Sequence, residues 1–311
     1  TLSSSSAASD VYKRQQPAVA RRPPRALVRL TAARARAARR IGPPVRHAAP
    51  GPRPLLPPAD DVKALLVAAS LHRDSHISLR AVVANGGGQP RARAALARCL
   101  LDHLGLCDVP VGVGSHGVPY DAQPHEYALH GYEHVDAAAL PDGAQLMLDA
   151  LRDAAPKSVL VALISSLRDF ADLLLAQPQL VIAKVHTVAI MGGLERDERA
   201  ASGWAPDSSV NNGFDMAAAE AVYAFCFREG VRMTVTSRHA VPLLPMQLAK
   251  SFAERTHDPV MRYLADAQFL GLQGLWRKLC DGQLPPRCSK QWFFETFCGV
   301  DRKTVRAARR A

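Results

Sequence analysis

The chain has 311 residues, 39 lysines and arginines against 28 aspartates and glutamates, and a formal net charge of +11. Residues 1–59 hold 12 of the basic residues and one acid, Asp10, so they carry the whole excess; residues 60–311 are balanced, with 27 of each sign. A balanced folded part argues against a nucleic-acid-binding face. The sequence has no run of 18 apolar residues, so we expect no membrane-spanning helix.

Residues 1–59 do not have the composition of a folded domain. The stretch SSAASDVYKRQ is the translation in one frame of an adapter used in transposase-based sequencing libraries, so we interpret residues 1–15 as an artefact. Residues 16–59 are rich in Arg, Ala and Pro and hold no acid, which predicts a disordered leader. Three origins stay open: an organellar transit peptide, a basic tail that contacts anionic partners such as RNA, and a GC-rich stretch read in the wrong frame that joins the coding sequence near Ala59.

Helix and strand patterns alternate from Asp60 onward. Apolar residues at helical spacing predict a helix over residues 60–70. A buried strand is predicted over 77–85, where Asn85 leads into three glycines, and a helix follows from Pro90 to a stop at Gly105. Further strands are predicted over 109–114, 158–164, 184–193 and 231–237, and further helices over 166–176 and 215–230.

This alternation predicts an α/β fold with a mostly parallel open sheet covered by helices on both faces. A mostly helical C-terminal part follows, over roughly residues 245–311. Ligands of such sheets bind beyond the carboxyl ends of the strands. We therefore expect Asn85, the 165–169 turn, Gly192-Gly193 and Ser237 to lie at the edge that holds the site.

The six cysteines form no CxxC pair, and their spacing fits no zinc pattern. We expect reduced structural thiols, which favours an intracellular compartment. The predicted location is cytoplasmic, or organellar if the leader is a genuine transit peptide.

Several segments follow one another in a characteristic order: Asp60-Asp61 before an apolar helix, Asn85 after the next strand, then VLVALISSLRDFADLL, VHTVAIMGG and SSVNNGFDMAAAEAV. Together they resemble the inosine–uridine-preferring nucleoside hydrolases over roughly residues 60–240, with a weaker match through 300. The resemblance implies a Rossmann-like domain over 60–300, followed by a basic tail over 301–311. The ending LPPRCSKQWFFETFCG is similar to a branch of the family found in eukaryotic sequences.

The resemblance also implies a reaction, hydrolysis of the N-ribosidic bond of a purine or pyrimidine ribonucleoside by a calcium-activated water. It implies that four residues contact the ribose: Asp60, Asn85, Met191 and Asn211. The implied calcium ligands are Asp61 and the backbone carbonyl of Arg168. For Asp60 and Asp61, capping of the helix N-terminus stays open as the alternative role.

Other positions depart from the family pattern. In the family pattern D-x-D-P-G-x-D-D, the first two aspartates correspond to Pro54 and Leu56 of this chain. The second is the family's general base and a calcium ligand, and leucine can neither bind calcium nor accept a proton. The glutamate that accompanies Asn211 in the family is Ser209 here. The last calcium aspartate falls at Ser289; Asp258 is the alternative, although a helix-capping role is favoured for it.

Two hypotheses follow for the function. In the first, a frame error before Ala59 hides the missing aspartates of an enzyme; in the second, the protein is a pseudoenzyme that binds a nucleoside, a sugar or a protein partner. We predict that the chain as written has little or no hydrolase activity. The expected partner is a small nucleoside or ribosyl ligand, and a homo-oligomer is left open. Three residues are candidates for contact with the departing base: His239, His257 and Trp204.

Overall fold

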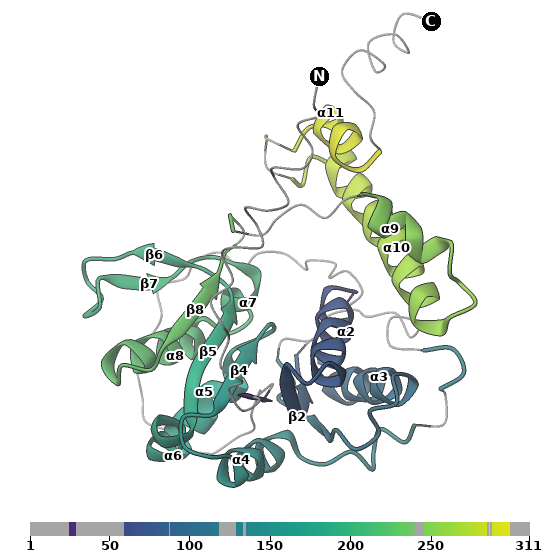
Figure 1. Cartoon of the computed structure of the whole chain (residues 1–311). Coiled ribbons are helices and arrows are strands. Elements are labelled where there is room, and N and C mark those ends of the chain that lie inside the picture. Colours follow the sequence, from purple (N-terminus) through teal and green to yellow (C-terminus); the bar gives the residue numbers. More distant parts are fainter. Residues whose placement is uncertain are drawn as a thin grey trace, which may run out of the picture.

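The computed structural model of the chain describes the backbone of residues 25–28 and residues 59–86, 88–117, 129–132, 135–237, 239–240, 246–284, 286 and 288–298. Its centre is a six-stranded sheet with the order β3-β2-β1-β4-β5-β8 (Figure 1). All five strand pairings are parallel. The strands are β1 (Arg25–Val28), β2 (Ile77–Ala84), β3 (Val111–Val113), β4 (Val159–Leu163), β5 (Val185–Met191) and β8 (Met233–Thr236).

Helices cover both faces of this sheet, which confirms the predicted fold class (Figure 1). They are α2 (Ala59–Arg73), α3 (Pro90–His103), α4 (Gly143–Asp153), α5 (Arg168–Ala176), α6 (Pro178–Lys184) and α8 (Met216–Arg228). Successive side chains of a strand point to opposite faces. Accordingly, Val82 packs in one core with Leu65 of α2, whereas Val83 packs in the other with Met147 of α4 and Phe170 of α5.

The strand β1 comes from the leader, for which the sequence predicted no regular structure. It lies between β2 and β4, with Leu27 in register with Leu79 on one side and with Leu160 on the other. Neighbouring strands are about 4.8 Å apart, so β2 and β4 share one sheet only through a strand between them. Such pairing uses backbone groups, which any short extended segment offers. The other residues of 1–58, and the tail 301–311, lie outside the described residues.

Helices make up the described C-terminal part, as predicted: α9 (Met246–Ala253), α10 (Pro259–Cys280), α11 (Lys290–Phe293) and the π-helical turn η2 (Phe294–Cys298). The first half of α10 packs against α2, where Val260 and Leu264 share a core with Leu65. Its second half extends away from the sheet toward α11, and Trp276 packs on Phe293 with ring centroids 5.0 Å apart (Figure 1). None of the six cysteines forms a disulfide.

The strand order reverses at β1. Strands β2 and β3 lie on one side of it, and β4, β5 and β8 lie on the other. In open α/β sheets this reversal opens a crevice at the carboxyl ends of the strands. Beyond β5 the chain forms a small antiparallel hairpin, β6 (Leu194–Arg196) and β7 (Trp204–Pro206), and the short helix α7 (Val210–Gly213). Within the described ranges, no helix is both long and apolar enough to cross a bilayer.

Candidate functional site

A pocket lies where the strand order reverses. Its lining comes from α2, from the end of β2, from α3 and from the end of β4, and its empty volume is about 620 Å³. Most of the lining is apolar, and the polar lining residues are Asp61, Asn85, Arg93 and Ser165. The pocket therefore combines an apolar wall with a few polar groups near the strand ends.

The two adjacent aspartates have different environments. Both lie in the first turn of α2, where a carboxylate is favoured by the helix dipole. Asp61 is half-buried and lines the pocket, whereas Asp60 is exposed and does not. Burial lowers the pKa of the nearby Lys63, and the charge of Asp60 partly offsets this effect. The structure thus places one carboxylate of the pair at the ligand edge and the other beside a lysine.

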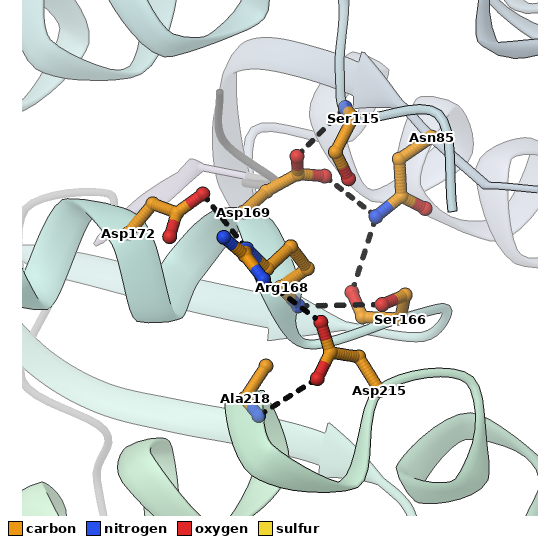
Figure 2. A network of polar contacts seen from close by, with 8 residues as sticks. All are labelled: Asn85, Ser115, Ser166, Arg168, Asp169, Asp172, Asp215 and Ala218. Atoms are coloured by element: carbon orange, nitrogen blue, oxygen red, sulfur yellow. Dashed lines mark hydrogen bonds and ion pairs between the residues drawn. The ribbon is translucent and has the colours of Figure 1, made fainter. Parts of the chain in front are cut away.

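Asn85 follows β2 directly and is 3% exposed. Its Nδ2 donates to the carbonyl oxygen of Ser166 at 3.2 Å and to Oδ2 of Asp169 at 2.5 Å. Both amide hydrogens therefore have acceptors, and this fixes the orientation of the amide. Its oxygen points away from both partners (Figure 2), and among the described residues it has no hydrogen-bond partner. Asn85 lines the pocket and has a buried amide oxygen to which no described residue donates.

Asp169 is the site residue that the sequence did not single out. It is fully buried in the first turn of α5, and its Oδ1 accepts the backbone N–H of Ser115 at 2.8 Å. A Cβ at Gly114 would lie 2.9 Å from Asp169 Oδ2 and 3.0 Å from Asn85 Cβ, so only glycine fits there. One carboxylate thus ties together the ends of β2, β3 and β4. An acidic residue in the turn after a buried strand was the available signal, because aspartate is rarely buried without partners.

Asn211 lies in α7 and binds the ends of two neighbouring strands, β4 and β5. Its Nδ2 donates to the carbonyl oxygens of Met191 at 2.9 Å and of Ile164, a pocket residue, at 3.2 Å. As in Asn85, both amide hydrogens are used on the protein. Met191 is 39% exposed at the end of β5, and neither Met191 nor Asn211 is among the residues that line the pocket. Ser209 precedes α7, and among the described residues its buried hydroxyl has no hydrogen-bond partner.

Arg168 connects two helices through its side chain. Its guanidinium donates to Asp172 at 3.0 Å and to Asp215 at 3.2 Å, and Asp215 also caps α8 through the N–H of Ala218 (Figure 2). The hydrogen bond to Asp172 is the largest cause of the raised pKa of Arg168. The predicted metal role concerns the backbone carbonyl of Arg168; the side-chain contacts account for the position of its guanidinium.

The two candidates for the last metal ligand are not among the residues that line the pocket. Ser289 caps α11, where its hydroxyl accepts the N–H of Trp292 at 3.1 Å. Asp258 caps α10 and pairs with His103, the last residue of α3. Both side chains are therefore used at helix N-termini. Pro54 and Leu56 lie outside the described residues.

The three candidates for contact with the departing base are dispersed. His257 adjoins Asp258 and is exposed, and His239 is exposed beyond β8. Trp204 lies on β7, where the guanidinium of Arg196 stacks over its ring at 4.2 Å. None of the three lines the pocket.

The described residues do not fit a calcium ion. Calcium takes six to eight oxygen ligands, several of them carboxylate. In the part of the chain that the structure describes, no group of three or more His, Cys, Asp or Glu residues could hold a metal. Asp61 is the one carboxylate residue among those that line the pocket. The calcium site that the resemblance implied is therefore not made up by these side chains.

Fold and site together define a Rossmann-like α/β protein with a pocket at the reversal of its strand order. The family model for inosine-uridine preferring nucleoside hydrolases matches residues 57–281, well over half of the chain. The chain therefore belongs to this family, as the sequence resemblance implied.

Solved structures with the same fold include two effector proteins. The effector XOO4466 is 25% identical, with a TM-score of 0.66 over 91% of this chain and 75% of that chain. The type III effector XopQ, complexed with adenosine diphosphate ribose, is 28% identical, with a TM-score of 0.63 over 76% and 69% of the two chains. A purine-preferring ribonucleoside hydrolase from Gardnerella vaginalis, 15% identical with a TM-score of 0.51 over 70% of each chain, shares the fold. A search of curated proteins gives no match.

Proposed function

We propose that the pocket binds the ribosyl part of a nucleoside or nucleoside derivative, and that the chain cleaves the N-ribosidic bond slowly or not at all. One observation carries the binding part. Asn85 and Asn211 both use their amide hydrogens on protein acceptors at the strand ends, so each keeps its amide oxygen for a ligand. Amide oxygens in this orientation accept hydrogen bonds from hydroxyl groups.

A ribosyl group also matches the residues that line the pocket beside Asn85. Its hydroxyls donate hydrogen bonds, and the Asp61 carboxylate is a further acceptor in the same pocket. The apolar lining suits the flat face of a nucleobase. The adenosine diphosphate ribose bound to XopQ contains ribosyl groups, and this supports the same class of ligand here.

The catalytic part of the proposal rests on the acids available for proton transfer. Cleavage needs a proton acceptor beside an activated water. The position that aligns with the family's general base is Leu56, whose side chain accepts no proton. Of the described carboxylates near the pocket, Asp61 lines it, whereas Asp169 lies outside the lining and accepts hydrogen bonds from Asn85 and Ser115. We therefore expect ligand binding with little turnover.

The second candidate function is a working nucleosidase, the activity for which the family is named. Its specific support is the position of Asp61, which opens α2 and faces the pocket as a family site residue would. If Asp61 alone suffices as the acid–base group, inosine and uridine are cleaved to ribose and free base.

Calorimetry with inosine, uridine and adenosine diphosphate ribose, run beside a chromatographic assay for free base with and without added calcium, separates the two functions. Binding of one of these ligands without release of base supports the proposal. Asn211→Leu is expected to weaken that binding about tenfold, since one hydrogen bond to the ligand is lost. Release of base at rates typical of enzymes refutes the proposed loss of catalysis. Lack of binding to all three ligands at millimolar concentration refutes the binding function.

A further inference from the structure

We infer that Asp169 is a positioning residue, whose carboxylate orients the amide of Asn85 so that an oxygen, and not an NH2 group, faces the pocket. The inference rests on the proposed function, because it assumes that the pocket takes a ribosyl ligand. It goes further because it gives Asp169, which does not line the pocket, control over whether Asn85 presents a hydrogen-bond acceptor or a donor there.

The geometry of three partners supports this role. Asp169 is 0% exposed and Asn85 is 3% exposed, so the contact between them is buried. Nδ2 of Asn85 lies 2.5 Å from Asp169 Oδ2 and 3.2 Å from the Ser166 carbonyl oxygen. The other oxygen of Asp169 accepts the N–H of Ser115 at 2.8 Å (Figure 2). Asn85 and Ser115 thus donate to different oxygens of the same carboxylate.

A carboxylate is the group that makes this arrangement unambiguous. An ionised aspartate only accepts hydrogen bonds, so the amide edge that faces it must be the NH2 edge. The Ser166 carbonyl, also an acceptor, favours the same orientation. If the amide of Asn85 were reversed, its oxygen would face two other oxygens in a buried site. Both hydrogen bonds would be lost, and three acceptors would face one another without a donor between them.

An asparagine at position 169 would remove this constraint. It has nearly the same shape, but it offers one oxygen and one NH2 group. The backbone N–H of Ser115 cannot reverse, so the oxygen of the new amide is expected to stay with Ser115, and its NH2 group then faces the NH2 group of Asn85. Rotation of the Asn85 amide relieves that clash, although it gives up the hydrogen bond to the Ser166 carbonyl, and it turns an NH2 group toward the pocket. A ligand hydroxyl that donated to Asn85 then meets a donor.

The chain offers a matched control one turn along the same helix. Asp172 is also on α5, but it pairs with Arg168 and does not line the pocket. Asp172→Asn therefore makes the same chemical change away from Asn85. The exchanged pair, Asn85→Asp with Asp169→Asn, gives a second test: the amide at 169 donates to the carboxylate at 85, and an oxygen again faces the pocket.

The first measurement needs no ligand. The side-chain NH2 resonances of Asn85 are assigned by their absence in Asn85→Leu, and their exchange with solvent is followed by NMR. In the unsubstituted protein and in Asp172→Asn we expect slow exchange, because both hydrogens are bonded and buried. In Asp169→Asn we expect faster exchange. Fast exchange in the unsubstituted protein overturns the inference even if Asp169→Asn fails to fold.

The second measurement compares a ribonucleoside ligand with its 2′-, 3′- and 5′-deoxy analogues. We expect Asp169→Asn to bind the parent ligand about tenfold more weakly and to lose discrimination against one of the three analogues, the same one as in Asn85→Leu. The exchanged pair should recover part of this discrimination, which a purely structural role would not predict. Unchanged discrimination in Asp169→Asn refutes the positioning role. If no variant binds any ligand but the exchange pattern holds, then the proposed function fails and the Asp169–Asn85 geometry stands.

Discussion

His103 and Asp258 join the end of α3 to the start of α10, with His103 Nε2 3.1 Å from Asp258 Oδ2. The other oxygen of the same carboxylate accepts the N–H groups of Val260 and Met261 and so caps α10. The ring of His103 also contacts the hydroxyl of Tyr132 through Nδ1 at 3.0 Å. Asp258 thus has three partners: Val260 and Met261 within α10, which it caps, and His103, through which it joins α10 to α3.

Replacement of this aspartate is expected to lower stability. Asp258→Ala removes the cap and the ion pair and should reduce the free energy of unfolding by about 1–2 kcal/mol. A change of 1 kcal/mol corresponds to roughly 2–4 °C in the midpoint of thermal unfolding for a domain of this size. Differential scanning calorimetry measures it. Unchanged affinity for the ribosyl ligand would agree with the capping role, whereas loss of binding without loss of stability would favour the metal role that the family resemblance left open.

The same residue gives a pH dependence with a definite sign. Burial raises the pKa of Asp258, but the hydrogen bonds from Met261, His103 and Val260 outweigh it, and its pKa lies below the ordinary value. A lowered folded pKa stabilises the protein above the unfolded pKa, near about 3.9, and this contribution disappears as the pH falls through the folded pKa. The stability difference between the protein and Asp258→Asn should therefore shrink below about pH 4. A difference that grows on acidification contradicts this assignment.

Two adjacent asparagines are expected to behave differently. Asn212 is fully buried, and its Nδ2 donates to the carbonyl of Gly193 at 2.9 Å and to Asp207 at 3.2 Å, so it holds the base of the β6–β7 hairpin. Asn212→Leu should destabilise the fold by about 2–3 kcal/mol, because buried carbonyls lose their donor. Asn211→Leu should instead weaken binding of the ribosyl ligand. Chemical denaturation measures the loss of stability and calorimetry measures the loss of affinity. Equal loss of stability in both variants would contradict the different roles of the two asparagines.

The aspartates that open α2 form another matched pair. Asp61→Asn removes a carboxylate from the pocket. It should lower the affinity for a ribosyl ligand about tenfold, since a hydrogen bond to a charged acceptor is worth about 1.5–3 kcal/mol. Asp60→Asn, an exposed position outside the lining, should change the affinity much less. Titration calorimetry of both variants is the measurement. A larger effect at Asp60 would support the diol contact that the resemblance implies for that residue.

Gly114 tests how tightly the buried polar cluster is packed. A Cβ there would meet Asp169 Oδ2 at 2.9 Å, Asn85 Cβ at 3.0 Å and the Ala84 carbonyl at 3.1 Å. Gly114→Ala should therefore cost about 1–3 kcal/mol of stability and disturb ligand binding. At Gly213 nothing lies within 4 Å of the added atom, so Gly213→Ala is the control. Thermal unfolding measures the difference. If Gly114→Ala and Gly213→Ala have the same midpoint temperature of unfolding, the cluster is loosely packed.

Elements with strong periodic patterns were predicted closely. The strand expected over 77–85 is Ile77–Ala84, and the helix expected over 215–230 is Met216–Arg228. In both elements, the spacing of the apolar residues along the sequence matches the side that is buried. The hairpin formed by β6 and β7 was not predicted, because each strand has only three residues, and two of the three in β6 are exposed. The sequence likewise did not predict β1, which depends on backbone pairing with strands far along the chain.

The site was predicted unevenly for a similar reason. The sequence placed Asn85 and the 165–169 turn at one edge of the sheet, and the structure joins them through Asp169. The individual role of Asp169 was not predicted, because its partner lies 84 positions earlier and the contact depends on how the strand ends meet. That Asp61 lines the pocket and Asp60 does not depends on the direction in which α2 packs, and this direction cannot be predicted from the local sequence.

The four-residue strand β1 has a consequence for the folding of the whole sheet. It supplies the backbone partners of both β2 and β4, so a chain shortened to begin at Ala59 would have two unpaired strand edges in its middle. Exposed edges of this kind recruit strands from other molecules. A shortened protein is therefore expected to self-associate through β2 and β4, and residues Arg25–Val28, added in trans as part of a longer peptide, should compete with that association.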